Sequence, residues 1–309
     1  MNNQGYVLAA DVGGTNIRAA IIDSDGIIRK EQRFQAGLSH PGISGQDVID
    51  ALAGALSGLT GDTGNISAIG IGFPGFFRGN SGIVAASPNI PALRDFALAK
   101  ALERRMNLPV SAQNDGLCAA IGEHHFGTGK GKSNLLHITL GTGIGAGLIL
   151  NNQPYTGESG MAMELGHLCV DTNSNALLCG CGNTGCVEAY ASATAISSRY
   201  AELSGQQRDA ASVYALARRA DKTAIIIFEE AGAYLGKAIA EAVKLLDIHT
   251  VTISGGLSNA WPLLQPPLNL SLESNLITTQ KGRIFVQRSS LNDNAGLLGA
   301  AMLAHDLLA

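Results

Sequence analysis

The chain has 309 residues, of which 46% are hydrophobic and 15% are charged, and its formal net charge is −4. A chain of this size can bury a large core in two lobes, and it lacks the basic surface that a nucleic-acid partner requires. No leader peptide and no apolar run long enough to span a membrane are visible, so we expect a cytoplasmic protein without a membrane partner.

The N-terminal region predicts a hairpin with a glycine turn. Apolar runs over residues 7–10 and 17–22 flank Gly13-Gly14, and a third strand is expected over 27–34. Short apolar runs and helically spaced apolar residues then alternate, which indicates the α/β class. The expected elements are a helix over 45–59, a strand over 66–73, a helix over 97–106, a strand over 110–113 and a helix over 116–125.

The same hairpin pattern recurs in the middle of the chain. Apolar runs over 135–140 and 144–150 flank Gly141-Thr142-Gly143, so the two units form an internal repeat. Both turns can point backbone N–H groups at one ligand, and two such units would form a two-lobed phosphate clamp. The alternative is that hairpins with glycine and threonine turns are simply common.

The remainder of the chain is helical after a segment rich in glycine and cysteine over 151–190. Helices are expected over 193–203, 210–219, 223–246 and 295–308, with strands over 250–254 and 285–288. We expect two α/β lobes. The small lobe comprises residues 1–115, completed by the C-terminal helix 295–309, and the large lobe comprises 116–294 and includes a zinc motif at 167–186.

The first hairpin turn carries a carboxylate and two glycines. Asp11 ends its strand and can hold Mg²⁺, while Gly13 and Gly14 let the backbone approach phosphate oxygens without a Cβ in the way. The alternative is a plain turn with a solvated aspartate.

Two further glycine motifs could bind a nucleotide. Residues 140–147 do not fit the dinucleotide fingerprint, because the chain continues as a strand, and the chain has no Walker A lysine. Gly255-Gly256 ends a strand just before a helix, where a nucleotide phosphate would be attracted.

Asn114-Asp115 stands between a strand and a helix. Catalytic groups gather where the strands of α/β folds end, so Asp115 could take the proton from an attacking hydroxyl. It is equally consistent with this position that Asp115 caps the following helix.

The cysteine spacing predicts a metal centre. His167 precedes Cys179, Cys181 and Cys186, and three thiolates with one imidazole fill a tetrahedral shell. A filled shell describes a structural zinc rather than a catalytic one, and the alternative is a set of reduced free thiols.

Two carboxylates flank this motif. Glu164 and Glu188 are suited to bidentate hydrogen bonds with the hydroxyl pairs of a sugar, unless they are ordinary surface residues. The two remaining cysteines, Cys118 and Cys169, are expected to be small core residues.

Taken together, these motifs resemble the ROK family of sugar kinases and repressors, within the actin-like, hexokinase-like ATPases. The resemblance extends from the motif at 11–18 to the one at 293–300, and its most specific part is Glu164-x-Gly166-His167 followed by the cysteine motif at 179–188. It implies a two-lobed actin-like (ribonuclease H-like) ATPase fold, with mixed sheets flanked by helices and a zinc-binding loop.

The resemblance also implies a reaction and a role for each site residue. The reaction is transfer of the γ-phosphoryl group of ATP to the 6-hydroxyl of a hexose, assisted by Mg²⁺, with Asp115 as the general base. The residues that would bind the sugar are Gly75, Asn89, Asn114, Asp115, Glu164, His167 and Glu188. The residues that would bind the nucleotide and its metal are Asp11, Gly13, Gly14, Thr15, Thr142, Gly143, Gly255 and Gly256. Zn²⁺ would be held by His167, Cys179, Cys181 and Cys186.

The identity of the sugar is less well defined by the resemblance. We expect glucose, with N-acetylglucosamine, N-acetylmannosamine, allose and fructose as alternatives. The chain departs from the family pattern at Phe76-Phe77-Arg78 and at Met163, both near the expected sugar site. A repressor would need a DNA-binding segment before Val7, and a sugar sensor without catalysis would be expected to lack Asp115. We expect a homodimer or homotetramer, and polyphosphate remains an alternative donor.

Overall fold

The computed structural model describes residues 5–13, 16–38, 40, 42–60, 65–88 and 90–308. The chain divides into two compact units. The first consists of Met1–Ser133, Gly147–Ala162 and Asn294–Ala309, and the second consists of Asn134–Ala146 and Met163–Asp293. None of the described helices is both long and apolar enough to cross a membrane.

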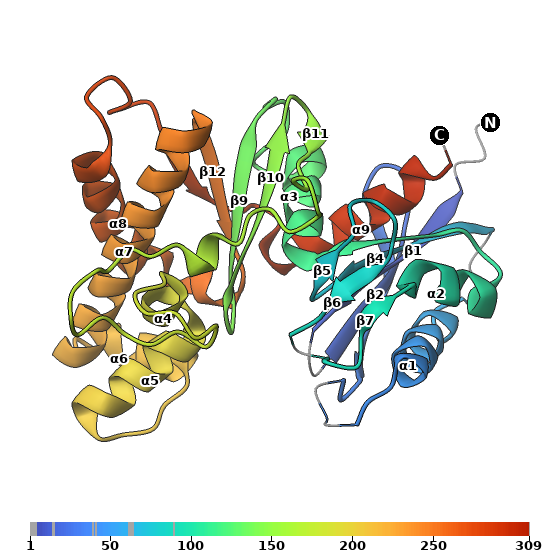
Figure 1. Ribbon diagram of the computed structural model, residues 1–309, viewed down its shortest axis with the longest axis horizontal. Helices are drawn as coiled ribbons and strands as arrows, with labels where there is room; N and C mark the ends of the chain where they lie inside the picture. The colour runs from blue at the N-terminus through green and yellow to red at the C-terminus, as the bar shows by residue number, and fades with distance from the viewer. Residues whose placement is uncertain are drawn as a thin grey trace. The chain divides into compact units, whose positions relative to one another are not determined.

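A five-stranded mixed sheet forms the centre of the first unit (Figure 1). Its strands, in spatial order, are β3 (Ile28–Gln35), β2 (Asn16–Ile22), β1 (Tyr6–Val12), β4 (Ile66–Phe73) and β8 (Val110–Asn114). β1 pairs antiparallel with β2, and β4 runs parallel to both β1 and β8. The carboxyl ends of β1, β4 and β8 therefore meet at one edge of the sheet, where the predicted residues Asp11, Gly75 and Asp115 are found.

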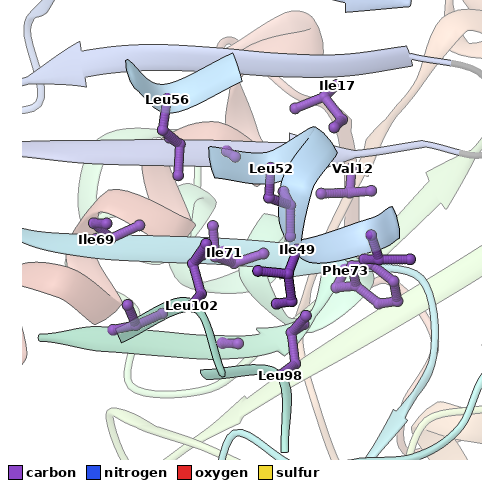
Figure 2. Packing of buried hydrophobic residues seen from close by; sticks show 14 of the residues in the cluster. Val12, Ile17, Ile49, Leu52, Leu56, Ile69, Ile71, Phe73, Leu98 and Leu102 are labelled. Carbon is purple, nitrogen blue, oxygen red and sulfur yellow. The ribbon is translucent and has the colours of Figure 1, made fainter. Parts of the chain in front are cut away.

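One face of this sheet is covered by α1 (Gly45–Ser57) and α2 (Leu98–Met106). The side chain of Ser44 caps α1 in a capping box with Asp47. The buried cluster in Figure 2 joins residues of α1 and α2 to alternate residues of the strands, as the two-residue period of a strand requires. Its labelled members are Val12, Ile17, Ile49, Leu52, Leu56, Ile69, Ile71, Phe73, Leu98 and Leu102.

The other face of the same sheet is packed against α9 (Ala295–Asp306), which also packs on α3 (Asp115–Phe126). Glycines allow this close approach. A Cβ at Gly70 in β4 would collide with the carbonyl oxygen of Ala300, and a Cβ at Gly299 would collide with that of Cys118. Strand β4 therefore presents apolar side chains to α1 and bare backbone to α9.

A small three-stranded sheet in the first unit was not predicted from the sequence. It consists of β5 (Phe76–Phe77), β6 (Val84–Ala86) and β7 (Arg94–Phe96) in the order β5-β6-β7. It includes Phe76 and Phe77, two of the residues at which the chain departs from the family pattern.

The second five-stranded sheet repeats the strand order of the first. Its order is β11 (Gln153–Pro154), β10 (Ile144–Leu150), β9 (Leu135–Leu140), β12 (Thr250–Ser254) and β13 (Phe285–Arg288). β12 runs parallel to β9 and β13, as β4 runs parallel to β1 and β8. The predicted internal repeat is therefore confirmed in the strand order.

The helices of the second unit follow the order expected from the sequence. α5 (Ala193–Ser204), α6 (Ala210–Ala217) and α7 (Lys222–Leu246) agree with the predicted ranges to within about two residues at each end. α8 (Trp261–Asn275) packs along α7, where a Cβ at Gly232 or Gly236 would collide with carbonyl oxygens of α8. The short α4 (Glu188–Ala191) follows the cysteine motif and packs on α7.

Candidate functional site

The first unit places Asp11 against the beginning of α9. Asp11 is the penultimate residue of β1 and lies beside Gly72 of β4 in the parallel register. A Cβ at Gly296, in the first turn of α9, would lie 3.1 Å from Asp11 Oδ2, so the carboxylate contacts that turn closely. The partial positive charge of a helix N-terminus favours a carboxylate there.

Arg18 and Asn294 support this arrangement, and the sequence analysis gave neither of them a role. Asn294 precedes α9 but makes no capping bond with its side chain. Its Oδ1 instead accepts a hydrogen bond of 2.7 Å from Arg18 Nη2, and Arg18 also donates to Glu31 Oε1 at 2.8 Å. The start of α9 is thereby tied to β2, the strand that follows the first turn.

Asp115 is the first residue of α3, and its neighbour Asn114 caps that helix. Asn114 Oδ1 accepts from the backbone N–H of Leu117 at 3.1 Å, and Asn114 Nδ2 donates to the carbonyl oxygen of Gly75 at 3.1 Å. Asp115 Oδ1 accepts from the N–H of Gly116 at 2.9 Å. The capping role that the sequence left open for Asp115 is thus filled by Asn114, whose amide retains one N–H and one lone pair for a ligand.

Burial changes the acidity of the Asp115 carboxyl group. Desolvation raises its pKa, and the hydrogen bond from Gly116 offsets part of that rise. The thiol of Cys118 is buried in the same region, and burial followed by the charges of Asp11 and Asp115 raises its pKa well above the ordinary value. Cys118 is therefore a neutral core residue, as predicted.

Some predicted residues of this unit cannot be placed. Gly14, Thr15 and Asn89 lie outside the described residues. Gly13 is exposed, and its N–H donates to the carbonyl oxygen of Asn16 at 2.8 Å, which closes the first turn.

The second unit brings the four predicted metal ligands together. One ligand atom from each of His167, Cys179, Cys181 and Cys186 lies within 4.8 Å of all the others. Cys181 Sγ is 3.7 Å from Cys186 Sγ, and Cys179 Sγ is 3.7 Å from His167 Nδ1. Bonds of about 2.3 Å from zinc to sulfur in a tetrahedral site place two sulfur atoms about 3.8 Å apart, so the donor set fits zinc.

The electrostatics of the cysteines also suit a cation. Burial, together with hydrogen bonds to the neighbouring thiols, raises the pKa of Cys186 to about 12. A thiolate at this position therefore needs a positive charge beside it, which a bound metal would supply.

Cys169 does not belong to this group and is exposed, so its prediction as a core residue was wrong. Its Sγ lies 3.4 Å from the carbonyl oxygen of Asp171, at the edge of a turn.

His167 presents its two nitrogen atoms to different neighbours. Nδ1 faces Cys179, whereas Nε2 lies 3.8 Å from Glu164 Oε2. A carboxylate on the second nitrogen of a metal-ligating histidine orients the ring. Glu164 is exposed, so this carboxylate remains accessible from solvent.

Glu188 links the metal motif to the second hairpin turn. Its Oε2 accepts from the backbone N–H of Ile144 at 2.7 Å, and its Oε1 lies 3.9 Å from Cys179 Sγ. A Cβ at Gly143 would collide with Oε2, so a larger residue at this position would have to displace the carboxylate from the N–H of Ile144. The contact between Glu188 and Ile144 depends on the tertiary fold and was not predicted from the sequence.

The predicted nucleotide glycines, Gly255 and Gly256, directly follow β12. This strand takes part in a buried hydrogen-bonded group of His137, Thr252 and Ser254, here called the polar ladder. Gly255 has a φ of +89°, and a Cβ at Gly256 would meet nothing within 4 Å, so the space over this turn is open. Beneath it, His137 Nε2 is 2.8 Å from Ser254 Oγ, and His137 Nδ1 is 2.8 Å from Thr252 Oγ1. Burial lowers the pKa of His137 to about 3, so the ring is neutral.

Known proteins resemble this chain over nearly its whole length. The family model described as the ROK family matches residues 7–307. The chain belongs to the ROK family. A glucokinase of Thermotoga maritima is 32% identical over 96% of this chain and 96% of its own. A glucokinase of Halalkalibacterium halodurans is 33% identical over 98% of this chain and 96% of its own.

A solved ROK structure confirms the fold. The crystal structure of a ROK family glucokinase from Streptomyces griseus, in complex with glucose and AMPPNP, matches with a TM-score of 0.85 and 31% identity. The match covers 98% of this chain and 100% of that one. The α/β fold predicted from the ROK motifs is therefore confirmed.

Proposed function

We propose that this ROK protein is an ATP-dependent hexokinase that phosphorylates the 6-hydroxyl of an aldohexose, with glucose as the first candidate. The observation that supports this most strongly is the match over the full chain to glucokinases, including one solved with glucose and AMPPNP. The carboxylate that follows β8 supports this proposal, because Asp115 begins α3 directly after that strand and burial raises its pKa.

Asp115 would take the proton from the sugar hydroxyl as that oxygen attacks the γ-phosphorus. Burial raises the pKa of the Asp115 carboxyl group, and a carboxylate with a raised pKa is a stronger base than an ordinary aspartate. The amide of Asn114, fixed by Gly75 and Leu117, would orient the sugar next to it.

We assign the glycines of the two hairpin turns and those after β12 to nucleotide binding. AMPPNP in the Streptomyces griseus structure is an ATP analogue, which supports ATP as the donor here. We assign Asp11 to the Mg²⁺ that accompanies ATP, because carboxylate oxygens are its preferred protein ligands. Gly13 and Gly143 would keep backbone N–H groups accessible to phosphate oxygens.

We further propose that His167, Cys179, Cys181 and Cys186 hold one structural Zn²⁺. The spacing of the sulfur and nitrogen atoms fits tetrahedral zinc, and the three thiols with one imidazole leave no coordination position for substrate. When bound, zinc would supply a rigid cross-link between the η1 turn (Leu165–His167) and the segment that leads to Glu188. Glu164, His167 and Glu188 would then offer hydrogen-bonding groups to the sugar.

A second candidate substrate is an N-acetylhexosamine. A relative from Shewanella named N-acetylgalactosamine kinase is 30% identical over 96% of this chain. Phe77 is fully buried in the core of the first unit, so Phe76 and Met163, each half-buried, are the departures from the family pattern that we propose to affect the choice between glucose and an N-acetylhexosamine.

A coupled assay of ADP release tests the substrate proposal. The panel is glucose, N-acetylglucosamine, N-acetylmannosamine, N-acetylgalactosamine, mannose, allose and fructose, each at several concentrations. We expect the highest kcat/KM for glucose. A much higher value for another sugar would correct the substrate and leave the kinase assignment intact, whereas no turnover with any sugar would contradict the kinase assignment. Polyphosphate in place of ATP tests the donor, and light scattering tests the expected homodimer or homotetramer.

A further inference from the structure

A polar cluster behind the proposed metal site has no part in the function described so far. It joins the loop that carries the cysteines, here called the metal loop (residues 168–187), to α4 and α7 of the same unit. Its members are Asp171 of the loop, Tyr190 of α4, and Tyr234 and Lys237 of α7. Asp171 is almost fully buried, at 9% exposure, and charged residues are rarely buried without a specific set of partners.

The hydroxyl group of Tyr190 connects two distant parts of the metal loop. It donates to Asp171 Oδ2 at 2.7 Å and accepts from the backbone N–H of Leu177 at 2.8 Å. The bond from Tyr190 lowers the pKa of Asp171, and burial raises the pKa of Tyr190 to about 12. At neutral pH Asp171 is therefore ionised and Tyr190 protonated, which makes theirs a strong, charge-assisted bond.

Both segments held by Tyr190 continue directly into metal ligands. Leu177 stands two residues before Cys179, and its carbonyl oxygen accepts from the N–H of Gly185, which precedes Cys186, at 2.8 Å. Gly185 adopts a φ of +79° and packs so closely on the carbonyl of Asp171 that a Cβ would collide with it. A shift of Leu177 or Asp171 would therefore move two of the proposed ligands.

Helix α7 provides the platform for this hydroxyl. The ring of Tyr190 packs on that of Tyr234, with 4.0 Å between their centroids, and the Tyr234 hydroxyl lies 3.4 Å from Asp171 Oδ2. Lys237, one turn further along α7, donates to the carbonyl oxygen of Val170. The metal loop is thus fastened to a helix of 25 residues at two neighbouring points.

Tyr190 also lies two residues after Glu188 on the four-residue helix α4. So short a helix has little stability of its own, and its orientation depends on what it packs against. The position of the Glu188 carboxylate, which holds Ile144 at 2.7 Å, therefore depends on the anchoring of Tyr190.

We propose that Tyr190 is a positioning residue whose hydroxyl group fastens the metal loop to α4, while its ring rests on α7, and thereby sets how long zinc is retained and where Glu188 meets the sugar. The inference rests on the proposed zinc site and sugar kinase activity. It extends both proposals, because zinc retention and sugar affinity would then depend on the contact of Tyr190 with Asp171 and Leu177, and none of these three residues is assigned to bind zinc or sugar.

The test is Tyr190→Phe, which removes the hydroxyl and keeps the ring on Tyr234. The zinc content of the purified protein is measured first. The rate at which zinc passes to the chelator 4-(2-pyridylazo)resorcinol is measured next, and then KM and kcat for the preferred sugar. Because one charge-assisted and one backbone hydrogen bond are lost, we expect zinc release about tenfold faster and a sugar KM about three to ten times higher. We expect kcat within about threefold of the wild type, since Asp115 is untouched.

A matched control separates positioning from general loosening. Tyr200→Phe removes a hydroxyl that lies 3.5 Å from Asp221 Oδ2 and links α5 to the start of α7, away from the metal loop. It should leave both zinc release and sugar KM unchanged. Equal acceleration of zinc release in both variants would overturn the proposal.

Other outcomes also decide whether the positioning role of Tyr190 holds. A Tyr190→Phe protein with the zinc release rate and sugar KM of the wild type overturns the positioning role, even if its melting temperature falls. If Tyr190→Phe does not fold, Asp171→Asn weakens the same hydrogen bond and is expected to show the same faster zinc release and higher sugar KM. The absence of both changes would equally overturn the positioning role.

The two proposals can fail separately. A wild-type protein without zinc contradicts the proposed metal site itself, whereas zinc-loaded wild type with an unresponsive Tyr190→Phe contradicts the positioning role alone.

Discussion

The two five-stranded sheets have the same strand order but obtain the carboxylates at their turns differently. In the first sheet the carboxylate is local, because Asp11 belongs to β1 itself and rests on the first turn of α9. In the second sheet the equivalent strand ends in Leu140, and the carboxylate that reaches the turn is Glu188 from the segment after the cysteines. One repeated scaffold thus supports two arrangements, one whose carboxylate belongs to the strand itself and one whose carboxylate comes from a segment later in the chain.

The faces of the two sheets differ as well. Gly70 of the first sheet allows α9 to approach the backbone closely, whereas the second sheet buries the polar ladder of His137, Thr252 and Ser254. A buried hydrogen-bonded ladder fixes strand pairing through specific partners, whereas close packing on glycine fixes it through shape. The repeat therefore specifies topology, and the local residues specify how each copy is held.

The largest expected effect is that of Asp115→Asn, in the first unit. The substitution keeps the size and hydrogen-bonding groups of the side chain but removes the base, so kcat should fall by about 10²–10⁴-fold. In the wild type, the acidic limb of kcat should lie above the ordinary range of an aspartate, since burial raises the pKa of Asp115 and activity is lost as pH falls through it. Steady-state kinetics across pH measure both.

If kcat of Asp115→Asn fell by less than about tenfold, Asp115 would not be the base, and the base would have to be another residue. Circular dichroism and calorimetric sugar binding serve as controls, and both should remain close to those of the wild type.

The pair Gly143→Ala and Gly13→Ala tests the contrast between the two turns directly. A Cβ at Gly143 collides with Glu188, whereas one at Gly13 lies 3.4 Å from the nearest atom, the carbonyl oxygen of Asn16. We expect Gly143→Ala to lower the free energy of unfolding by about 1–3 kcal/mol, as overpacking does, and Gly13→Ala to change it little. Urea unfolding of both variants measures the difference, and equal losses would show that the second turn does not depend on Glu188.

The smallest expected effect concerns the polar ladder and pH. The folded pKa of His137, about 3, is below the ordinary value of 6.5, so the unfolded chain binds the additional proton as pH falls. The contribution of neutral His137 to the free energy of unfolding is present above pH 6.5 and is lost progressively as the pH falls toward 3. At pH 6 the loss relative to pH 8 is about 1 kcal/mol.

His137→Gln should remove that component of the pH dependence. His249→Gln, which changes an exposed histidine of the same unit, should retain it. Unfolding free energies at pH 8 and pH 6 supply the comparison, and parallel behaviour of the wild type and His137→Gln would contradict the assignment.

Much of this molecule could be predicted from the sequence because its signals are local. The apolar runs at 66–73, 135–140 and 144–150 became β4, β9 and β10 with the same bounds, since continuous apolar runs between glycines or prolines have few alternatives. The group of His167, Cys179, Cys181 and Cys186 could be predicted because this combination of donor types at short spacing is typical of a zinc site, and the structure brings those residues together.

Other features could not be predicted because they depend on tertiary partners. The two-residue strand β5 is defined only by its pairing with β6, and the bounds of α8 were obscured by Pro266 and Pro267 inside it. The exposure of Cys169 and the contact of Glu188 with Ile144 depend on how the metal loop folds back. The Tyr190 cluster joins residues that carry no common motif.

The position of α9 in the chain has a consequence for synthesis on the ribosome. The helix completes the first unit, yet it is translated only after the whole segment from 163 to 293 that forms most of the second. At typical elongation rates, roughly 10–30 s pass between the emergence of residue 133 and that of residue 294. During that interval the bare backbone at Gly70 has no covering helix, so the first unit cannot complete its packing until α9 has emerged.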